Sequence, residues 1–145
     1  METELSIQQV AQQTGLSIDT LRYYERIGLI EPVKRASSGH RRYKQRDLEW
    51  IRLLIDLRET GMPIAQMVHF AQLRRQGAAT AAERLQMLEQ HQIALEQQMQ
   101  KLEHHRLALQ RKIAHKKAFM AQQEAAAQSA STSERSEEEV EVFDI

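Results

Sequence analysis

The placement of glycine and proline divides the chain into two parts that must fold differently. The glycines and prolines all lie before residue 78, and none occurs in the 68 residues that follow. Because Gly and Pro interrupt helices, the first part must consist of short elements joined by turns, whereas the second can form one long helix. We therefore expect a mainly α fold, with a compact domain over residues 1–76, a helix over 77–123 and a tail over 124–145.

Two short helices are predicted at the start of the chain. Ser6 and Gln9 form a capping box before a helix that stops near Gly15. Ser17 caps a second helix that runs to about Ile27 after a three-residue turn. This arrangement is typical of a helix-turn-helix, whose second helix enters the major groove of DNA. A small helical hairpin without a DNA-binding role is the alternative interpretation of these two helices.

A strongly basic segment follows the two helices. Residues 34–46 contain six Lys/Arg, one His and no acid. A Ser-Gly turn between residues 33–36 and 41–43 predicts a β-hairpin there. A basic hairpin after a helix-turn-helix forms a wing, which can hold DNA phosphates that the recognition helix does not reach. A solvated basic surface is the alternative.

Two further helices are predicted before the long one. One spans about residues 45–60, with core positions Leu48, Trp50, Ile51, Leu53, Leu54, Ile55 and Leu57, and the next opens with Pro63 at its first helical position. We expect Ile64, Met67, Val68 and Ala71 to share the buried face of that next helix. Trp50 and Phe70 are predicted to fill the centre of the core.

Several segments of the first part resemble the DNA-binding domain of MerR-type transcription regulators. They are residues 21–32 (LRYYERIGLIEP), 39–43 (GHRRY), 47–48 (DL) and 58–64 (RETGMPI), in the order and spacing of that family. The resemblance covers residues 5–75 motif by motif, and the architecture more loosely to about residue 120. One departure is Lys44, which stands where similar proteins place a capping hydroxyl or acid, so we expect a less well capped third helix.

The resemblance implies a winged helix-turn-helix that binds double-stranded DNA as a homodimer. It implies an inverted-repeat promoter whose spacer the protein distorts so that RNA polymerase can engage it, with the cost of bending met by contacts to both half-sites. For Tyr24 an alternative is a mainly buried ring with only its hydroxyl at the DNA. The implied DNA contacts are Ser17, Thr20, Arg22, Tyr23, Tyr24, Arg35, His40, Arg41, Arg42, Tyr43 and Arg58.

The second part of the chain carries a coiled-coil pattern. Thr80 and Glu83 form a capping box, and heptads counted from Leu85 place four consecutive leucines at d. Such a seam predicts pairing with a second copy; the heptads leave the orientation open, and the resemblance implies an antiparallel pair. The predicted dimer interface consists of Leu85, Leu88, Leu95, Met99, Leu102, Leu109 and Ile113.

Charge is segregated although the chain has 20 Lys/Arg and 20 Asp/Glu. Residues 134–145 carry six acidic residues and one basic residue, so residues 124–145 are predicted to be a disordered acidic tail. Within it, residues 140–145 alternate apolar and acidic side chains, which suits a short strand or a docking motif, a solvating end being the alternative.

Cysteine is absent, which excludes thiol-based metal or redox sensing and cysteine nucleophiles. No catalytic or metal-ligating set stands at a usable spacing, so we predict no enzyme activity and no cofactor; metal sensing through His91, His104, His105 and His115 is a weaker alternative. No apolar run reaches about 18 residues and the N-terminus is acidic, so we expect a cytoplasmic protein without a membrane partner.

The sequence leaves three aspects of function open. It gives neither the operator, nor the sign of regulation, nor the identity of a small-molecule effector. An architectural or recombination-accessory protein that bends DNA is one alternative, and a coiled-coil protein whose basic segment binds an acidic partner is another.

Overall fold

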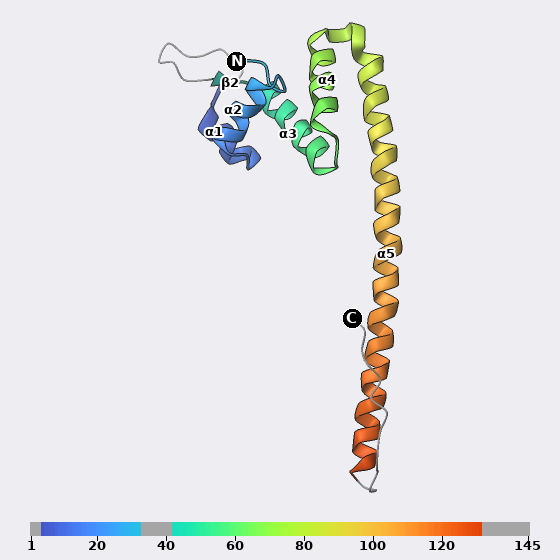
Figure 1. Ribbon diagram of the computed structural model, residues 1–145. Coiled ribbons are helices and arrows are strands. Elements are labelled where there is room, and N and C mark those ends of the chain that lie inside the picture. The colour runs from blue at the N-terminus through green and yellow to red at the C-terminus, as the bar shows by residue number, and fades with distance from the viewer. Residues whose placement is uncertain (1–3, 33–41, 132–145) are drawn as a thin grey trace. The chain divides into compact units, whose positions relative to one another are not determined.

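The computed structural model describes residues 4–32 and 42–131 of the chain (Figure 1). The chain divides into two compact units, residues 1–95 and 96–145. The elements run in the order β1 (Leu5–Ser6), α1 (Ile7–Thr14), α2 (Ile18–Arg26), β2 (Arg42–Tyr43), α3 (Gln45–Glu59), α4 (Ile64–Arg75), the 3₁₀ turn η1 (Gly77–Thr80) and α5 (Ala81–Ala130). The predicted mainly helical fold is confirmed.

The first two helices begin and end where their capping residues place them. The Ser6 hydroxyl accepts a hydrogen bond from the Gln9 N–H at 3.1 Å, and the Gln9 side chain accepts one from the Ser6 N–H at 2.9 Å. Gly15 then adopts φ 78°, the left-handed conformation that a helix C-terminus favours. The Ser17 hydroxyl accepts from the Thr20 N–H at 3.0 Å and opens α2. Both predicted helices, and the turn between them, are confirmed.

A two-stranded antiparallel sheet closes this part of the domain. β1 pairs with β2, with Leu5 opposite Tyr43 and Ser6 opposite Arg42. The sequence predicted a hairpin partner for residues 41–43 within residues 33–36, and that hairpin lies outside the described residues. The pairing with β1 was not predicted, because a two-residue strand has no periodicity and its partner is distant in the chain.

The core lies between α1, α2, α3 and α4. Trp50 and Phe70 stack with ring centroids 5.7 Å apart, and both are buried as predicted. The indole N–H of Trp50 donates to the Leu29 carbonyl at 2.8 Å, which ties α3 to the segment after α2. Met67 and Ala71 of α4 are also buried, but Ile64 is 46% exposed. The prediction for Ile64 was wrong, because α4 meets the core only after its first turn.

The start of α3 agrees with the expectation for Lys44, whereas the start of α4 departs slightly from its prediction. The Lys44 side chain caps no backbone N–H at the start of α3, and the Asp47 carboxylate instead accepts from the Lys44 N–H at 2.7 Å. Pro63 was predicted at the first helical position of α4 but is its N-cap, with ψ 146°, and the helix begins at Ile64. The missing N–H of Pro63 costs nothing there, because the first N–H groups of a helix have no intrahelical acceptor.

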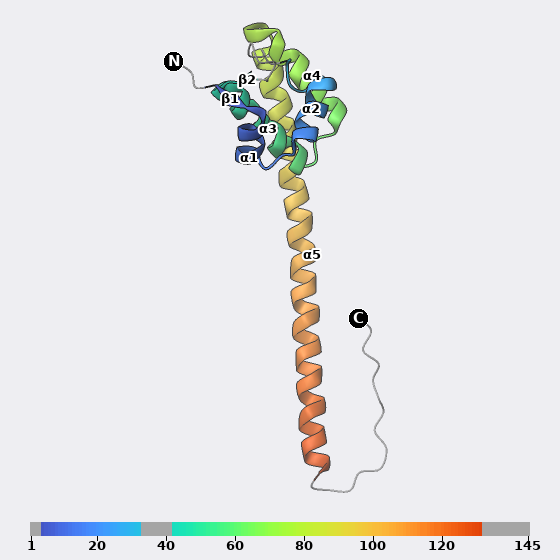
Figure 2. The same ribbon diagram turned by 90° about the vertical axis from the view of Figure 1, so that its left-hand side faces the viewer.

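α5 is one unbroken helix in both views of the ribbon (Figures 1 and 2). The Thr80 hydroxyl donates to the Leu73 carbonyl and accepts from Arg84 at 3.2 Å, so the predicted capping box with Glu83 is wrong. The helix ends at Ala130, beyond the predicted end near residue 123, because residues 124–130 are rich in alanine, the best helix former. The predicted tail is therefore helical over residues 124–130, and residues 132–145 lie outside the described part.

Candidate nucleic-acid interface

α2 buries one face and exposes another. Leu21 and Tyr24 are buried in the core. The exposed side chains stand at spacings of three, four and seven residues, which places them on one face of the helix. They are Asp19, Arg22, Tyr23 and Arg26. This exposed α2 face combines two guanidinium groups with an aromatic ring, a set suited to phosphates and base edges.

Arg26 belongs to this face, although it was not among the predicted DNA contacts. Its guanidinium carbon lies 5.9 Å from the centroid of the Tyr23 ring, which is 44% exposed. The spacing of three residues between Tyr23 and Arg26 is the sequence signal that could have found it.

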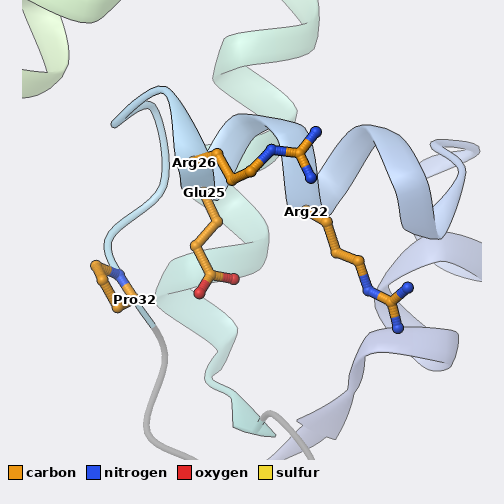
Figure 3. A pocket seen from close by; sticks show the side chains of 4 residues that line it. All are labelled: Arg22, Glu25, Arg26 and Pro32. Atoms are coloured by element: carbon orange, nitrogen blue, oxygen red, sulfur yellow. The ribbon is translucent and has the colours of Figure 1, made fainter.

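A pocket of about 250 Å³ opens beside the exposed α2 face (Figure 3). Figure 3 shows Arg22, Glu25 and Arg26 on α2, and Pro32 on the segment that follows. The lining therefore combines two positive groups with one carboxylate. Within the described residues, the pocket can hold a polar or anionic group against α2.

The hydroxyls of Ser17 and Thr20 meet at the N-terminus of α2. Their oxygens are 2.8 Å apart, and Ser17 also accepts from the Thr20 N–H. Ser17 is exposed and Thr20 is half-buried. The structure thus brings both predicted residues to the helix end whose N–H groups and dipole favour anions.

Tyr24 and Arg58 form one unit at the back of α2. The ring of Tyr24 is only 3% exposed, and its hydroxyl accepts from Arg58 Nη1 at 2.8 Å. Arg58 Nη2 donates to Glu59 at 2.8 Å, and this bond is the main cause that raises the pKa of Arg58. Tyr24 is therefore a core residue that holds Arg58, and the prediction of a direct DNA contact through its ring is corrected.

The two predicted wing residues that the structure describes differ in exposure. Tyr43 is 0% exposed, so its predicted contact with DNA is corrected: a ring with no accessible surface cannot touch a ligand in this conformation. Arg42, next to it, is exposed and pairs with the Glu4 carboxylate at 2.5 Å. Alternation along β2 explains the difference, because successive side chains point to opposite faces. Arg35, His40 and Arg41 lie outside the described residues.

Two arginines of α4 pack on α3 and on the segment that follows α2. The Arg74 guanidinium lies 4.3 Å from the Trp50 ring centroid, and its partial burial lowers the pKa of this arginine. Arg75 donates to the Gly28 carbonyl and pairs with Glu31 at 3.3 Å. The two Arg75 contacts hold the segment that follows α2, and the Arg74 contact is with α3. These contacts could not be predicted from the sequence, because the partners are far apart in the chain.

Within residues 4–32 and 42–131, no group of three or more His, Cys, Asp or Glu side chains is arranged to hold a metal ion. His104 and His105 touch each other, with ring centroids 5.5 Å apart. None of the helices described in those same ranges is long and apolar enough to cross a membrane.

The predicted dimer residues lie on α5 with different exposures. Leu88 packs partly against the core, and Leu95 is also partly buried. The others are between 54% and 64% exposed in the single chain: Leu85, Met99, Leu102, Leu109 and Ile113. An apolar row of this size in water calls for a partner.

Known proteins share this architecture. The family model described as the MerR HTH family regulatory protein matches residues 5–73. HTH-type transcriptional regulator AdhR of Bacillus subtilis (strain 168) is 43% identical over 84 residues, which cover 58% of this chain and 60% of AdhR. HTH-type transcriptional activator TipA of Streptomyces coelicolor is 35% identical over 63% of this chain and 40% of TipA. The chain thus matches less than two thirds of the length of these curated relatives.

Two solved structures match over nearly their whole length. A putative MerR family transcriptional regulator from Listeria monocytogenes has a TM-score of 0.80 at 32% identity, covering 89% of this chain and 99% of that one. HiNmlR, a MerR family regulator lacking the sensor domain and bound to promoter DNA in its crystal structure, has a TM-score of 0.75 at 31% identity over 82% of this chain and 94% of its own. By its helix-turn-helix geometry and these matches, the chain belongs to the MerR family of helix-turn-helix regulatory proteins.

Proposed function

We propose that this protein is a transcription regulator that binds an inverted-repeat promoter as a homodimer. The observation that carries the proposal is the exposed α2 face, where Arg22, Tyr23 and Arg26 stand together on a helix whose other face is locked in the core. A rigid helix that presents guanidinium and aromatic groups can enter a major groove and contact both bases and phosphates. The promoter DNA held by HiNmlR supports this role for the corresponding fold.

Arg58 extends the surface beyond α2. The hydrogen bond from Arg58 to Tyr24 fixes the guanidinium next to α2, and its second bond goes to an exposed carboxylate, Glu59. An exposed ion pair of this kind contributes little stability, so Arg58 can exchange Glu59 for a DNA phosphate at small cost. Arg42 has the same freedom, since its pair with Glu4 is also exposed. Direct phosphate contacts are thereby assigned to Arg42 and Arg58.

The second copy pairs through the apolar row on α5. Residues 81–103 contain four acidic and two Lys/Arg residues, whereas residues 104–123 contain five Lys/Arg and no acid. In a parallel pair the basic halves would face each other, whereas an antiparallel pair sets each basic half against an acidic half. The charges therefore favour the antiparallel orientation, with two DNA-binding domains related by a two-fold axis and hence an inverted repeat.

Binding of two half-sites lets the dimer distort the promoter spacer so that RNA polymerase can engage it. Bending DNA costs several kcal/mol, which contacts from two domains can offset. A small-molecule effector would act by shifting the balance between two dimer geometries, and the absence of cysteine means that it would not act on a thiol.

The test is selection of bound duplexes from a random DNA pool, followed by affinity against salt concentration. We expect an enriched inverted repeat and a steep negative salt slope, and we expect Arg22→Ala to abolish the enrichment. Arg52→Ala, an exposed arginine on α3, is the matched control. If the selected duplexes share no sequence motif, the promoter-specific role is rejected and a DNA-bending architectural protein remains.

Orientation is tested separately by energy transfer in a mixed dimer. The chain contains no native cysteine, so Gln86→Cys on one copy and Gln122→Cys on the other can each carry a single dye. An antiparallel pair brings these positions together, whereas a parallel pair separates them by about 54 Å along the helices. Low transfer in a confirmed dimer would reject the antiparallel orientation.

A further inference from the structure

The basic half of α5 carries positive charge on the side that the proposed dimer leaves uncovered. His104, Arg111 and His115 follow Leu102, Leu109 and Ile113 by two residues each, which places them about 200° around the helix from the apolar row. All three are exposed. Lys112 and Phe119, seven residues apart, lie between these three residues and the apolar row; Lys112 is exposed and Phe119 is half-buried. We call this the outer face: His104, Arg111, Lys112, His115 and Phe119.

The outer face has no charge compensation from its own helix. Surface helices commonly balance Lys or Arg with an acid three or four residues away, as Arg106 does with Glu103 at 2.6 Å. Arg111 and Lys112 have no acid at such a spacing, because none occurs from residue 104 to 123. Lys112 stands four residues before another Lys, at position 116, and like charges at this spacing repel. The face therefore favours an anionic partner.

The acidic tail, residues 134–145, has the complementary chemistry. It carries six acidic residues and one basic residue, and over residues 140–145 the acids alternate with Val140, Val142 and Phe143. Acidic groups would meet Arg111 and Lys112, and apolar groups would meet Phe119. We propose that the acidic tail docks on the outer face of α5 in the same chain.

The length of the chain permits this contact. Phe119 lies 12 residues before Ser131, a distance of about 18 Å along the helix, and Arg111 lies about 30 Å before it. Residues 132–140 can span about 30 Å when extended. The segment 140–145 can therefore reach Phe119 and continue to Arg111, so no rearrangement of α5 is needed. Docking there would also keep the acids away from the basic segment 34–46.

The test is paramagnetic broadening of backbone amides in the full-length protein. Ile145→Cys accepts one spin label and retains all six acids of the tail. We expect the amides of residues 108–119 to lose most of their intensity at low salt and to recover it at about 1 M salt, where the Debye length falls to about 3 Å. Broadening centred on residues 4–32 and 42–75, or spread evenly around the end of α5, would overturn the proposal.

Two variants separate docking from a general charge effect. The first is a triple variant with Arg111→Gln, Lys112→Gln and Phe119→Ala. It should restore the intensities of the remaining amides without loss of helix content, because all three sites lie on a helix surface. Arg46→Gln with Arg52→Gln removes two exposed positive charges from α3 and should leave the broadening unchanged. Restoration by the α3 pair as well would overturn the assignment to the outer face.

A mixed sample identifies the chain that supplies the tail. Isotope-labelled protein without a spin label is combined with unlabelled protein that carries one. The proposal expects no broadening of residues 108–119 in this mixture, because docking occurs within one chain. The comparison is with protein in which the same chain carries both the isotope and the spin label. Equal broadening of residues 108–119 in the mixture would assign the tail to the partner and overturn the proposal.

Discussion

The hydroxyl of Tyr24 accepts a hydrogen bond from Nη1 of Arg58 at 2.8 Å, across 34 residues of sequence. This bond joins α2 to the C-terminal end of α3, so the guanidinium that we propose contacts a phosphate is fixed relative to the exposed α2 face. Since Tyr24 is buried, the position of Arg58 is set by the core.

Tyr24→Phe should therefore weaken DNA binding without removing a DNA contact. The ring still fills the core, and loss of one hydrogen bond to a charged group should lower the free energy of unfolding by about 1.5 to 3 kcal/mol. Operator affinity should fall several-fold because Arg58 is no longer held. Fluorescence anisotropy measures the affinity, and urea unfolding measures the stability. The matched control is the same change in an Arg58→Ala background, where it should have no further effect on affinity; a full additive loss there would contradict the role of Tyr24.

Arg26→Ala should reduce the salt dependence of DNA binding. If Arg26 contacts one phosphate, the slope of log affinity against log salt should become shallower by about 0.9. Titrations at several salt concentrations provide the measurement. Arg106→Ala, on α5, serves for comparison and should leave the slope unchanged. An unchanged slope for Arg26→Ala would show that Arg26 does not contact a phosphate and would leave Asp19, Arg22 and Tyr23 as the candidate contacts on the exposed α2 face.

Phe70→Ala tests the stacked pair at the centre of the core. Loss of a buried aromatic ring should cost about 3 to 5 kcal/mol of unfolding free energy. Ile64→Ala is the control, since this residue is 46% exposed, and surface changes of this kind stay within about 0.5 kcal/mol. Chemical unfolding followed by Trp50 fluorescence measures both. Equal losses for the two variants would show that Ile64 is buried in solution.

The hydrogen bond between Thr60 and His91 predicts which ring nitrogen of His91 carries the proton. The Thr60 hydroxyl lies 2.6 Å from the Asp56 carbonyl, to which it donates its only proton, and 2.7 Å from Nε2 of His91. The hydroxyl must then accept from His91, so neutral His91 should carry its proton on Nε2. Long-range ¹⁵N–¹H spectra of the imidazole show which nitrogen is protonated. A proton on Nδ1 alone would be inconsistent with this hydrogen bond.

Leu109→Asp should dissociate the dimer. Leu109 is 64% exposed in the single chain and belongs to the predicted row, so a carboxylate there would be buried without a partner on pairing. Sedimentation or light scattering should report a monomer at concentrations where the unchanged protein is dimeric. Ala108→Asp, one residue away and off the apolar row, should remain dimeric. A dimer for Leu109→Asp would move the interface away from the row.

The sequence by itself determined the local features of this protein, because those depend on residues close together in the chain. Capping by Ser6 and Ser17, the left-handed Gly15 and the unbroken helix after residue 80 follow from short-range hydrogen bonding and backbone conformation. The motifs that resemble the MerR family are equally local, and the family model matches them over residues 5–73.

Only the tertiary structure decided which of the predicted contact residues face solvent. Tyr23 and Tyr24 are neighbours of the same type, yet one is 44% exposed and the other 3%. Tyr43 is buried because β2 pairs with β1, and Ile64 is exposed because α4 meets the core one turn later. Burial depends on contacts between residues distant in the sequence, and periodicity along one segment cannot report where the opposing segment ends. The sequence therefore supplied the elements and their chemistry, and packing divided them between core and surface.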